Sequence, residues 1–435
     1  MGFYLVGYAL AFGDGGVFLA TSTEAFALND FTEYIRFFFQ YAFAATAATI
    51  VAGTIAERCK MTAYIYYSLF LTAFVYPIVA HAIWNKDGFL SAFHPSPFRG
   101  VGMIDFAGSG VVHMTGGATA LVAAIILGPR LGRFTDDDGN ALPEPHYFPP
   151  HSVSLQVLGT FILWFGWLGF NPGSTLLISP PGYSEIAALC AVNTVLSGAM
   201  GCISAIFTDT FLTFLRSGEI EYDLSMAMNG CLGGLVGITA SCSVVAPWSA
   251  LVIGLVGGLV YKGSSSLLIK MKVDDAVDAI PVHLFNGIWG CLATGLFAEP
   301  VRTKLAYGSD DHVGWFYSWG RGNADANLLL CQFVGILFIL GWTIGVMTPF
   351  FYLLKVFNVL RIDPIEERAG IDYSHHKGPA YHFSGPTKAE MDMVDEFHHG
   401  SRSKHNTPNN GEKDPPCNTS ERHRVVTIKT PDTIL

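Results

Sequence analysis

Apolar segments long enough to cross a lipid bilayer recur along most of the chain, and they restrict the possible folds severely. A helix needs about 20 mostly apolar residues to span the hydrocarbon core. Hydropathy identifies ten apolar segments, at about residues 2–13, 37–56, 62–84, 106–128, 153–170, 185–214, 224–241, 249–270, 279–298 and 327–356. The first is too short to span, and the others reach or approach the required length. The sequence therefore predicts an all-α polytopic membrane protein.

The composition agrees with this class and argues against others. Charged residues make up 14% of the chain, whereas soluble domains carry about 25%. No basic stripe indicates a nucleic-acid partner. The eight cysteines form no CxxC pair and most lie in apolar segments, so we expect buried thiols. We expect no cofactor and no metal, and an intramembrane enzyme is disfavoured because neither HExxH nor GxSxG occurs.

Basic residues in the loops predict the orientation. Ten lie on one side of the membrane: Arg58, Lys60, Arg130, Arg133, Arg216, Lys262, Lys270, Lys272, Lys355 and Arg361. Six lie on the other: Arg36, Lys86, Arg99, Arg302, Lys304 and Arg321. The last apolar segment ends at residue 356, so residues 1–356 are expected to form the transmembrane domain. Because the more positive side faces the cytoplasm, residues 357–435 are expected to form a cytoplasmic tail with a disordered end.

Two histidines inside apolar segments are functional candidates, because burying an ionisable group in a membrane is costly. His113 lies in DFAGSGVVHMTGG and follows Asp105, and His283 lies in DAIPVHLFNGIWG and follows Asp278. Their segments are five apart, an odd number, so the two helices should run in opposite directions. That arrangement is typical of inverted repeats, which bind substrate near the midplane. A paired site and two satisfied core histidines are equally supported here, and His81 is better explained by capping or packing.

Aromatic residues gather where segments reach the outer side. Trp84 ends one segment, Phe39 and Phe43 begin another, and GWLGFNPGS supplies Phe170 at a third. Interfacial aromatics are usually membrane anchors. Aromatic rings also attract a cation that loses its water, by about 2 kcal/mol.

Five strings carry a resemblance to a known family. Between residues 40 and 291 they read QYAFAATAATIVAGTIAER, DFAGSGVVHMTGG, GTFILWFGWLGFNPGS, NGCLGGLVGITASC and DAIPVHLFNGIWG. With them the chain resembles the ammonium transporter family (the Amt/Mep/Rh superfamily), in its plant-type Amt branch. The resemblance implies eleven helices, as two inverted halves of five plus a long last helix, assembled as a homotrimer in the lipid of the plasma membrane. The first helix is absent here, because the chain starts inside the second, so we expect an N-terminally truncated member.

The resemblance also implies roles for individual residues. The vestibule that recruits ammonium would comprise Phe39, Phe43, Trp84 and Ser174. The gate would comprise Phe43 and Phe170, and the pore would be lined by His113, His283 and Trp167. Asp105 and Asp278 would support the site. In the tail, residues 357–381 would form an ordered regulatory segment, with Ser374 where plant relatives carry a phosphorylated threonine.

The implied activity is transmembrane transport of ammonium or ammonia, without enzymatic activity. A bare ion would be very costly in an apolar pore, so the ion would lose its water and its proton at the mouth. Two alternatives stay open: an ammonium sensor that signals through its tail, and a neutral ammonia channel of the Rh type. The aromatic vestibule favours a cation-recruiting Amt pore.

Overall fold

A computed structural model describes residues 1–374 except 23, 24 and 30, without the side chains of Tyr373 and Ser374. The described residues form helices and loops, and no β-strand occurs among them. In chain order the elements are η1 (Phe3–Gly7), α1 (Tyr8–Phe12), η2 (Phe26–Leu28), α2 (Tyr34–Thr54), α3 (Met61–Phe70), η3 (Leu71–Val75), α4 (Tyr76–Trp84), η4 (Phe98–Gly100), η5 (Ser109–Met114), α5 (Thr115–Leu127), α6 (Val153–Gly173), α7 (Tyr183–Ser217), α8 (Leu224–Thr239), α9 (Pro247–Lys270), η6 (Ile280–Phe285), α10 (Asn286–Phe297), α11 (Pro300–Tyr307), α12 (Trp315–Gly320), α13 (Asn327–Val356), α14 (Pro364–Ala369) and α15 (Ile371–Ser374).

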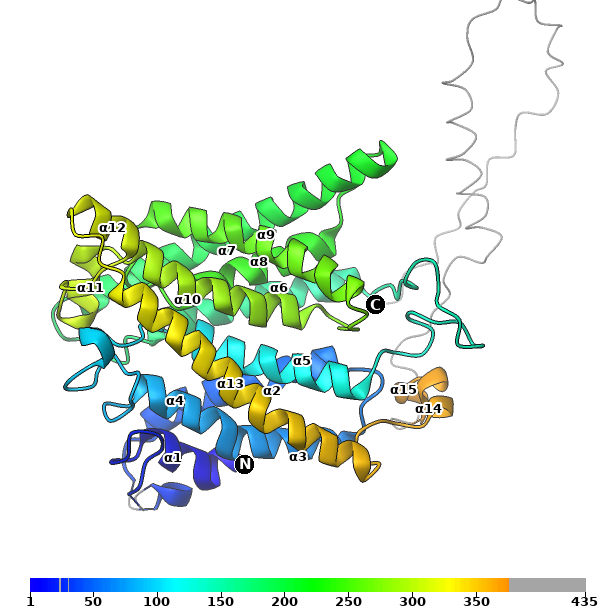
Figure 1. The fold of residues 1–435 in the computed structure, drawn as a ribbon, viewed down its shortest axis with the longest axis horizontal. Coiled ribbons are helices and arrows are strands. Elements are labelled where there is room, and N and C mark those ends of the chain that lie inside the picture. Colours follow the sequence, from blue (N-terminus) through cyan, green and yellow to red (C-terminus); the bar gives the residue numbers. More distant parts are fainter. Residues whose placement is uncertain (23–24, 30, 375–435) are drawn as a thin grey trace, which may run out of the picture. The chain divides into compact units, whose positions relative to one another are not determined.

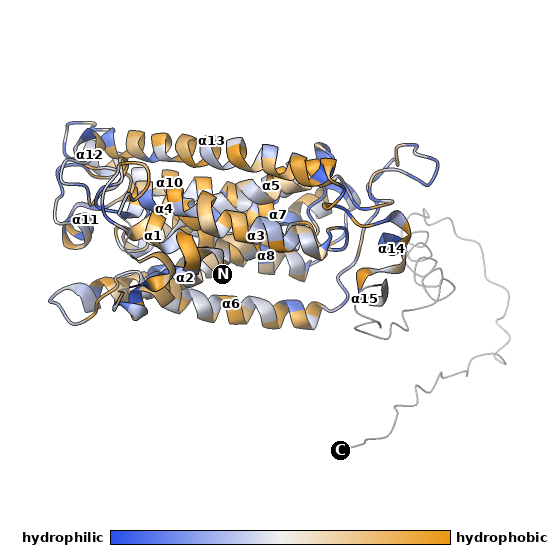
Figure 2. Cartoon of the chain, turned by 90° about the horizontal axis from the view of Figure 1, so that it is seen from below, coloured by the Kyte–Doolittle hydropathy of each residue, from blue (hydrophilic) through white to orange (hydrophobic). Residues whose placement is uncertain are grey.

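Eight helices in the described part of the chain are long and apolar enough to cross a membrane. They are Tyr34–Thr54, Met61–Trp84, Ser109–Leu127, Val153–Gly173, Tyr183–Ser217, Pro247–Lys270, Ile280–Phe297 and Asn327–Val356. Phe3–Phe12 and α8 are shorter apolar helices. Apolar residues run along the helices, and the polar loops gather beyond their two ends (Figure 2). The all-α polytopic membrane fold is therefore confirmed.

The two histidine-bearing spans run antiparallel and touch. Gly290 of α10 is so close to Ser109 of η5 that a Cβ there would lie 2.6 Å from the serine Oγ. A Cβ on Gly117 of α5 would lie 2.5 Å from the backbone nitrogen of Leu284 in η6. The start of each span thus meets the later part of the other, and glycine permits the close approach. Each span opens with a π-helical segment that contains its histidine, η5 or η6, a form that is frequent at functional sites.

The long helix α13 lies beside both histidine-bearing spans. It packs against α5, which follows the first histidine, and against α10, which follows the second. In Figure 1 it crosses diagonally, from the end where α11 and α12 lie to the end where α14 and α15 lie. Its position near both histidine-bearing spans explains why its inward-facing residues, such as Ile339 and Met347, are fully buried.

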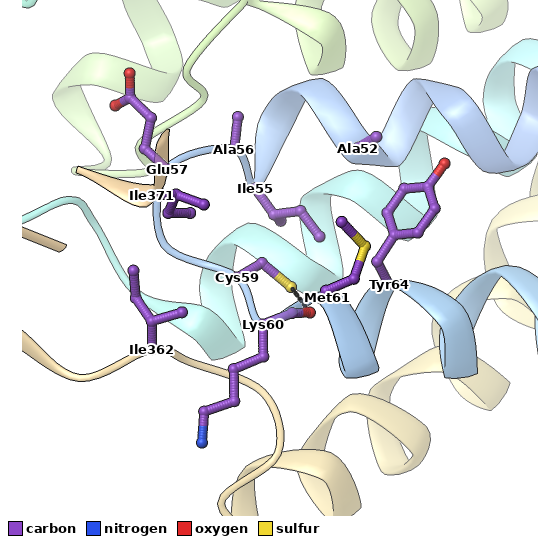
Figure 3. A pocket seen from close by; sticks show the side chains of 10 residues that line it. All are labelled: Ala52, Ile55, Ala56, Glu57, Cys59, Lys60, Met61, Tyr64, Ile362 and Ile371. Carbon is purple, nitrogen blue, oxygen red and sulfur yellow. Dashed lines mark hydrogen bonds between the residues drawn. The ribbon is translucent and has the colours of Figure 1, made fainter. Parts of the chain in front are cut away.

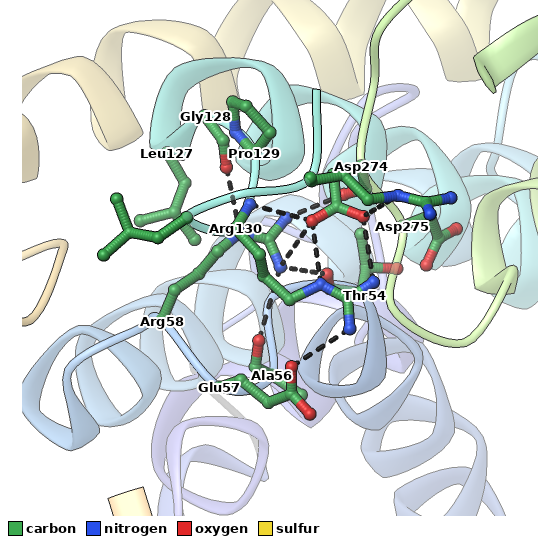
Figure 4. A network of polar contacts seen from close by, with 12 residues as sticks. Thr54, Ala56, Glu57, Arg58, Leu127, Gly128, Pro129, Arg130, Asp274 and Asp275 are labelled. Carbon is green, nitrogen blue, oxygen red and sulfur yellow. Dashed lines mark hydrogen bonds and ion pairs between the residues drawn. The ribbon is translucent and has the colours of Figure 1, made fainter. Parts of the chain in front are cut away.

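Buried ion pairs tie three loops together at the end where α14 lies (Figure 4). Arg130, just after α5, donates through Nε and Nη2 to the Asp274 carboxylate at 2.9 and 3.0 Å. Arg58, between α2 and α3, donates to the backbone oxygens of Asp274 and Gly128 at 2.7 and 2.9 Å. Burial alone would raise the pKa of Asp274, but the hydrogen bonds and charge of Arg130, together with the Arg58 charge, hold it below its usual range.

The segment that follows α13 packs on the same loops. Arg361 donates to the backbone oxygens of Leu127 and Pro129 at 2.9 and 2.8 Å, and it pairs with Glu367 at 2.9 Å. Glu367 in turn accepts a hydrogen bond from the backbone nitrogen of Leu131. Residues 357–374 therefore contact the loop that begins after α5.

We expect Asp274→Asn to lower the free energy of unfolding by about 3–5 kcal/mol, since it leaves the buried Arg58 without its paired carboxylate and Arg130 with Glu57 alone. The measurement is thermal unfolding of the purified protein in detergent at pH 7. Because the folded state lowers the Asp274 pKa, this stabilisation is complete above the ordinary aspartate pKa, about 4, and is lost as the pH falls below it. The variant should lack that acid dependence. Asp137→Asn is the control, because Asp137 forms an exposed pair with Arg368; equal melting temperatures for all three proteins would contradict the expectation.

Candidate functional site

Aromatic side chains from two spans meet beside Asp105, at the start of the first histidine-bearing span; this is the end that the sequence analysis expects to face outward. The rings of Phe39 and Phe43, both on α2, lie 4.6 Å apart, and Phe43 meets Trp84 of α4 edge-on at 5.7 Å. Trp84 is held in place because its indole nitrogen donates to the backbone oxygen of Asp105 at 2.7 Å. The structure thus brings together three of the four residues assigned to the vestibule.

The fourth, Ser174, lies at the C-terminal end of α6. Its hydroxyl donates to the backbone oxygen of Phe170 at 2.9 Å. A Cβ on the neighbouring Gly173 would lie 3.1 Å from the ring of Phe39, which brings this helix end close to the aromatic cluster. With its hydrogen engaged, the Ser174 oxygen keeps its lone pairs for an incoming donor.

Phe43 and Phe170 stack directly on each other. Their ring centroids are 3.9 Å apart and their planes differ by 15°. Phe43 is only 2% exposed. The Phe170 ring also lies 5.8 Å from the His113 ring, so the stack separates the outer aromatic cluster from the histidines.

His113 and His283 form a direct pair. Their Nδ1 atoms are 3.1 Å apart, and the rings lie nearly parallel at 5.1 Å. A hydrogen bond between two Nδ1 atoms requires one ring to carry its hydrogen there and the other to accept it. The buried Nε2 of His113 has no hydrogen-bond partner within the part of the chain that the structure describes, so a polar guest could bind it.

Trp167 forms one wall beside the pair. Its ring stacks on His113 at 5.3 Å with an angle of 11°. The indole nitrogen donates to Thr239 Oγ1 at 2.9 Å, and that hydroxyl donates to the backbone oxygen of Leu235. Sequence reasoning missed Thr239, because a lone threonine in an apolar helix gives no functional signal.

Asp105 organises the start of the first histidine-bearing span. Its carboxylate accepts hydrogen bonds from the backbone nitrogens of Gly108, Gly110 and Val111 at 3.1, 3.0 and 2.8 Å. Burial raises the pKa of Asp105 to about 6, although these backbone hydrogen bonds oppose the change. The side chain is only 2% exposed. Its hydrogen bonds therefore hold the backbone at the start of the span.

In the second span, Asp275 is the residue that accepts a backbone hydrogen bond at the start of the helix, as Asp105 does in the first, and sequence reasoning did not identify it. Asp275 accepts a hydrogen bond from the backbone nitrogen of Ile280 at 2.6 Å. Burial, reinforced by the nearby Asp278 charge, raises its pKa to about 6. Both capping residues stand eight positions before their histidine, at 105 and 113 and at 275 and 283. That equal spacing is the signal that could have identified Asp275.

Asp278 is held by side chains instead. The hydroxyls of Tyr261 and Ser265, both on α9, donate to its carboxylate at 2.9 Å. Burial raises the Asp278 pKa, and these hydrogen bonds oppose the rise. Its backbone adopts a φ of +57°, a conformation that aspartate tolerates better than most residues. The role as an acid near the second histidine fits this position, while its two partners were not foreseen.

His81 lies apart from this path. Its ring is fully buried, with Nδ1 3.0 Å from the backbone oxygen of Ala11 and Nε2 2.8 Å from that of Gly16. It therefore fastens the loop after α1, which agrees with the packing interpretation. Among the residues that the structure describes, no group of three His, Cys, Asp or Glu side chains could hold a metal ion.

Known proteins resemble this chain along most of its length. The model of the Ammonium Transporter Family matches residues 1–381. The putative ammonium transporter 1 member 5 of Arabidopsis thaliana is 43% identical, over 87% of this chain and 76% of that protein. Among solved structures, one described as a sensor Amt protein is 33% identical with a TM-score of 0.71, covering 86% of each chain. Saccharomyces cerevisiae Mep2 is 29% identical with a TM-score of 0.70, covering 84% of this chain and 78% of its own.

Proposed function

The chain belongs to the ammonium transporter family, in its plant-type Amt branch, and we propose that it conducts ammonium or ammonia past the His113–His283 pair. One observation carries the proposal: ring contacts continue from Phe39 to Phe43, to Phe170, to His113 and to His283. This series begins at an aromatic cluster suited to a cation and ends at a buried pair of nitrogen bases.

Recruitment takes place at the outer cluster. Phe39, Phe43 and Trp84 present ring faces and edges to an ion that loses its water there, and such cation–π contacts offset part of the desolvation cost. The Ser174 oxygen accepts a hydrogen bond from the ion. These contacts favour a compact cation over a hydrated metal ion, because the hydrogens of ammonium match both an oxygen acceptor and an aromatic face.

Passage then requires the gate to open. Phe43 and Phe170 at 3.9 Å leave no space between their rings, so a change of side-chain rotamer has to precede each transfer. Beyond the gate, neutral ammonia can donate a hydrogen bond to Nε2 of His113. Trp167 keeps the histidine plane fixed through its stacking contact, so the two rings stay in register.

The assembly, location and tail control are parts of the same proposal. One face of helix α6 is exposed, with Phe161, Ile162 and Phe165 at 62%, 61% and 78%, which supports contact with lipid or with a second subunit of a homotrimer. We place the protein in the plasma membrane with its C-terminus in the cytoplasm. Residues 357–381 act as the regulatory segment; Ser374 ends α15, and its side chain and residues 375–381 lie outside the described residues.

A sensor is the second candidate, since a structural neighbour is described as a sensor Amt protein. A sensor reports ammonium through its tail and needs little flux. Voltage-clamp current measured together with uptake separates the alternatives. A transporter that moves the ammonium charge gives uptake with current, and a neutral channel gives uptake without current. A sensor gives neither at a transporter's rate.

We expect His113→Ala with His283→Ala to abolish selective ammonium uptake, because the buried nitrogen bases are lost. The measurement is uptake in ammonium-starved cells at matched membrane levels. His312→Ala serves as the control, since His312 lies in a loop near α12 and pairs with Asp325. Normal selective uptake by the double variant would leave both histidines as packing residues.

Trp84→Leu should raise the ammonium concentration for half-maximal uptake by up to roughly 30-fold, because an attraction of about 2 kcal/mol is removed. Trp84→Phe keeps a ring but loses the hydrogen bond to Asp105, so it separates the two roles of the indole. If the leucine variant keeps the original concentration dependence, Trp84 is only an interfacial anchor.

Ser374→Asp should lower uptake, also when co-expressed with the unchanged protein, whereas Ser374→Ala should not. A phosphate adds about −1.5 to −2 charges, and near Asp372 and Glu367 that charge would weaken the packing of the segment. The readout is uptake at equal surface levels. Full activity of the aspartate variant would exclude a switch at this position.

A further inference from the structure

An apolar cavity of about 160 Å³ lies between the α2–α3 connection and the C-terminal segment (Figure 3). Its walls are Ala52, Ile55, Ala56, Glu57, Cys59, Lys60, Met61, Tyr64, Ile362 and Ile371. Burial raises the pKa of the Cys59 thiol to about 12, so at neutral pH the thiol is uncharged and adds to the apolar lining. A water molecule would be poorly stabilised in such a cavity, because it needs hydrogen bonds to two or more polar partners.

The cavity lies where two spans leave the apolar part of the bilayer. Ala52 is close to the end of the span Tyr34–Thr54, and Met61 is the first residue of the span Met61–Trp84. Met61 is 61% exposed. With these two helices spanning the bilayer, an apolar space at their ends would lie near the boundary of the hydrocarbon core, and lipid is therefore the occupant that we consider.

Lys60 in the wall of the cavity, and Lys355 near it in the fold, could face an anion. Lys60 donates to the backbone oxygen of Asn358 at 2.7 Å, and no carboxylate pairs with it among the described residues. The same holds for Lys355, which donates to the backbone oxygen of Ile126. Both lysines lie at one turn, because the Asn358 nitrogen bonds the Lys355 oxygen. Glu57, the carboxylate in the wall, is paired with Arg130 at 3.0 Å.

We propose that this cavity binds a segment of one acyl chain of an anionic phospholipid of the cytoplasmic leaflet, with Lys60 and Lys355 at its phosphate. Anionic lipids are concentrated in that leaflet and attract lysines close to its surface. The chain would fill space against Ile362 and Ile371, so the lipid would also stabilise the packing of the C-terminal segment. The site lies at the opposite end of the protein from the outer aromatic cluster and does not depend on what passes the histidines.

The test compares phosphatidylserine with phosphatidylcholine of identical chains, bound to the purified full chain in detergent and counted by native mass spectrometry. We expect preferential retention of phosphatidylserine. Lys60→Gln and Lys355→Gln should each weaken that binding about fivefold, and Ala52→Phe should weaken retention of both lipids by filling the cavity. Lys270→Gln is the matched control, because it removes one lysine charge from the same membrane face at the end of α9.

Equal retention of the two lipids by the unchanged protein would overturn the proposal, and so would a loss of binding in the control variant equal to that in the Lys60 and Lys355 variants. The occupant is tested separately: a photoreactive side chain at position 56 should cross-link to added phosphatidylserine. A cross-link to residues 375–435 or to a second copy of the chain, in place of the lipid, would assign the cavity to protein.

Discussion

The absence of water from the hydrocarbon core governs where this protein places its polar groups, because each one must find a partner inside the fold. Two carboxylates, Asp105 and Asp275, accept hydrogen bonds from the backbone nitrogens that open the two central spans. Arg58 satisfies backbone oxygens from three separate segments, although it is fully buried. Nε2 of His113 is one of several buried polar atoms that lack a hydrogen-bond partner within the described residues, and its position in the series of ring contacts makes the histidine pair the centre of the functional proposal.

The same constraint explains what could be predicted from the sequence. The spans, the buried histidines and their opposite directions follow from hydropathy and from counting segments, since lipid leaves helices as the only option for such segments. Phe43, Phe170 and Trp167 were identified through the family resemblance alone; in the structure Phe43 stacks on Phe170 and Trp167 stacks on His113. Thr239, Tyr261 and Asp275 were missed, because their importance depends on which neighbour lies across a helix interface, and local sequence does not contain that information. The π-helical turns at both histidines were missed for the same reason.

The loop network and the cavity show how the inner end is organised around side chains from distant parts of the sequence. Asp274 joins the connection after α9 to arginines from two other loops, while Arg361 brings the last described segment to the first of those loops. Residues 357–374 are attached through several polar contacts, among them the hydrogen bonds of Arg361 and the Ile362 nitrogen that donates to the Arg58 oxygen, and they also cover the apolar cavity. If lipid fills that cavity as proposed, the packing of this segment depends on the bilayer as well as on these contacts.

The contact between the two Nδ1 atoms gives the histidine pair a polarity. Only one hydrogen lies between them, so when His113 carries it, Nε2 of His113 is bare and Nε2 of His283 is protonated. A proton that enters at His113 and leaves from His283 moves this hydrogen across and reverses the pair. A second proton in the same direction then meets a donor where an acceptor stood, and it has to wait until both tautomers have returned. Neutral molecules that pass along the rings without exchanging a proton leave the polarity unchanged, so they need no such return between one passage and the next.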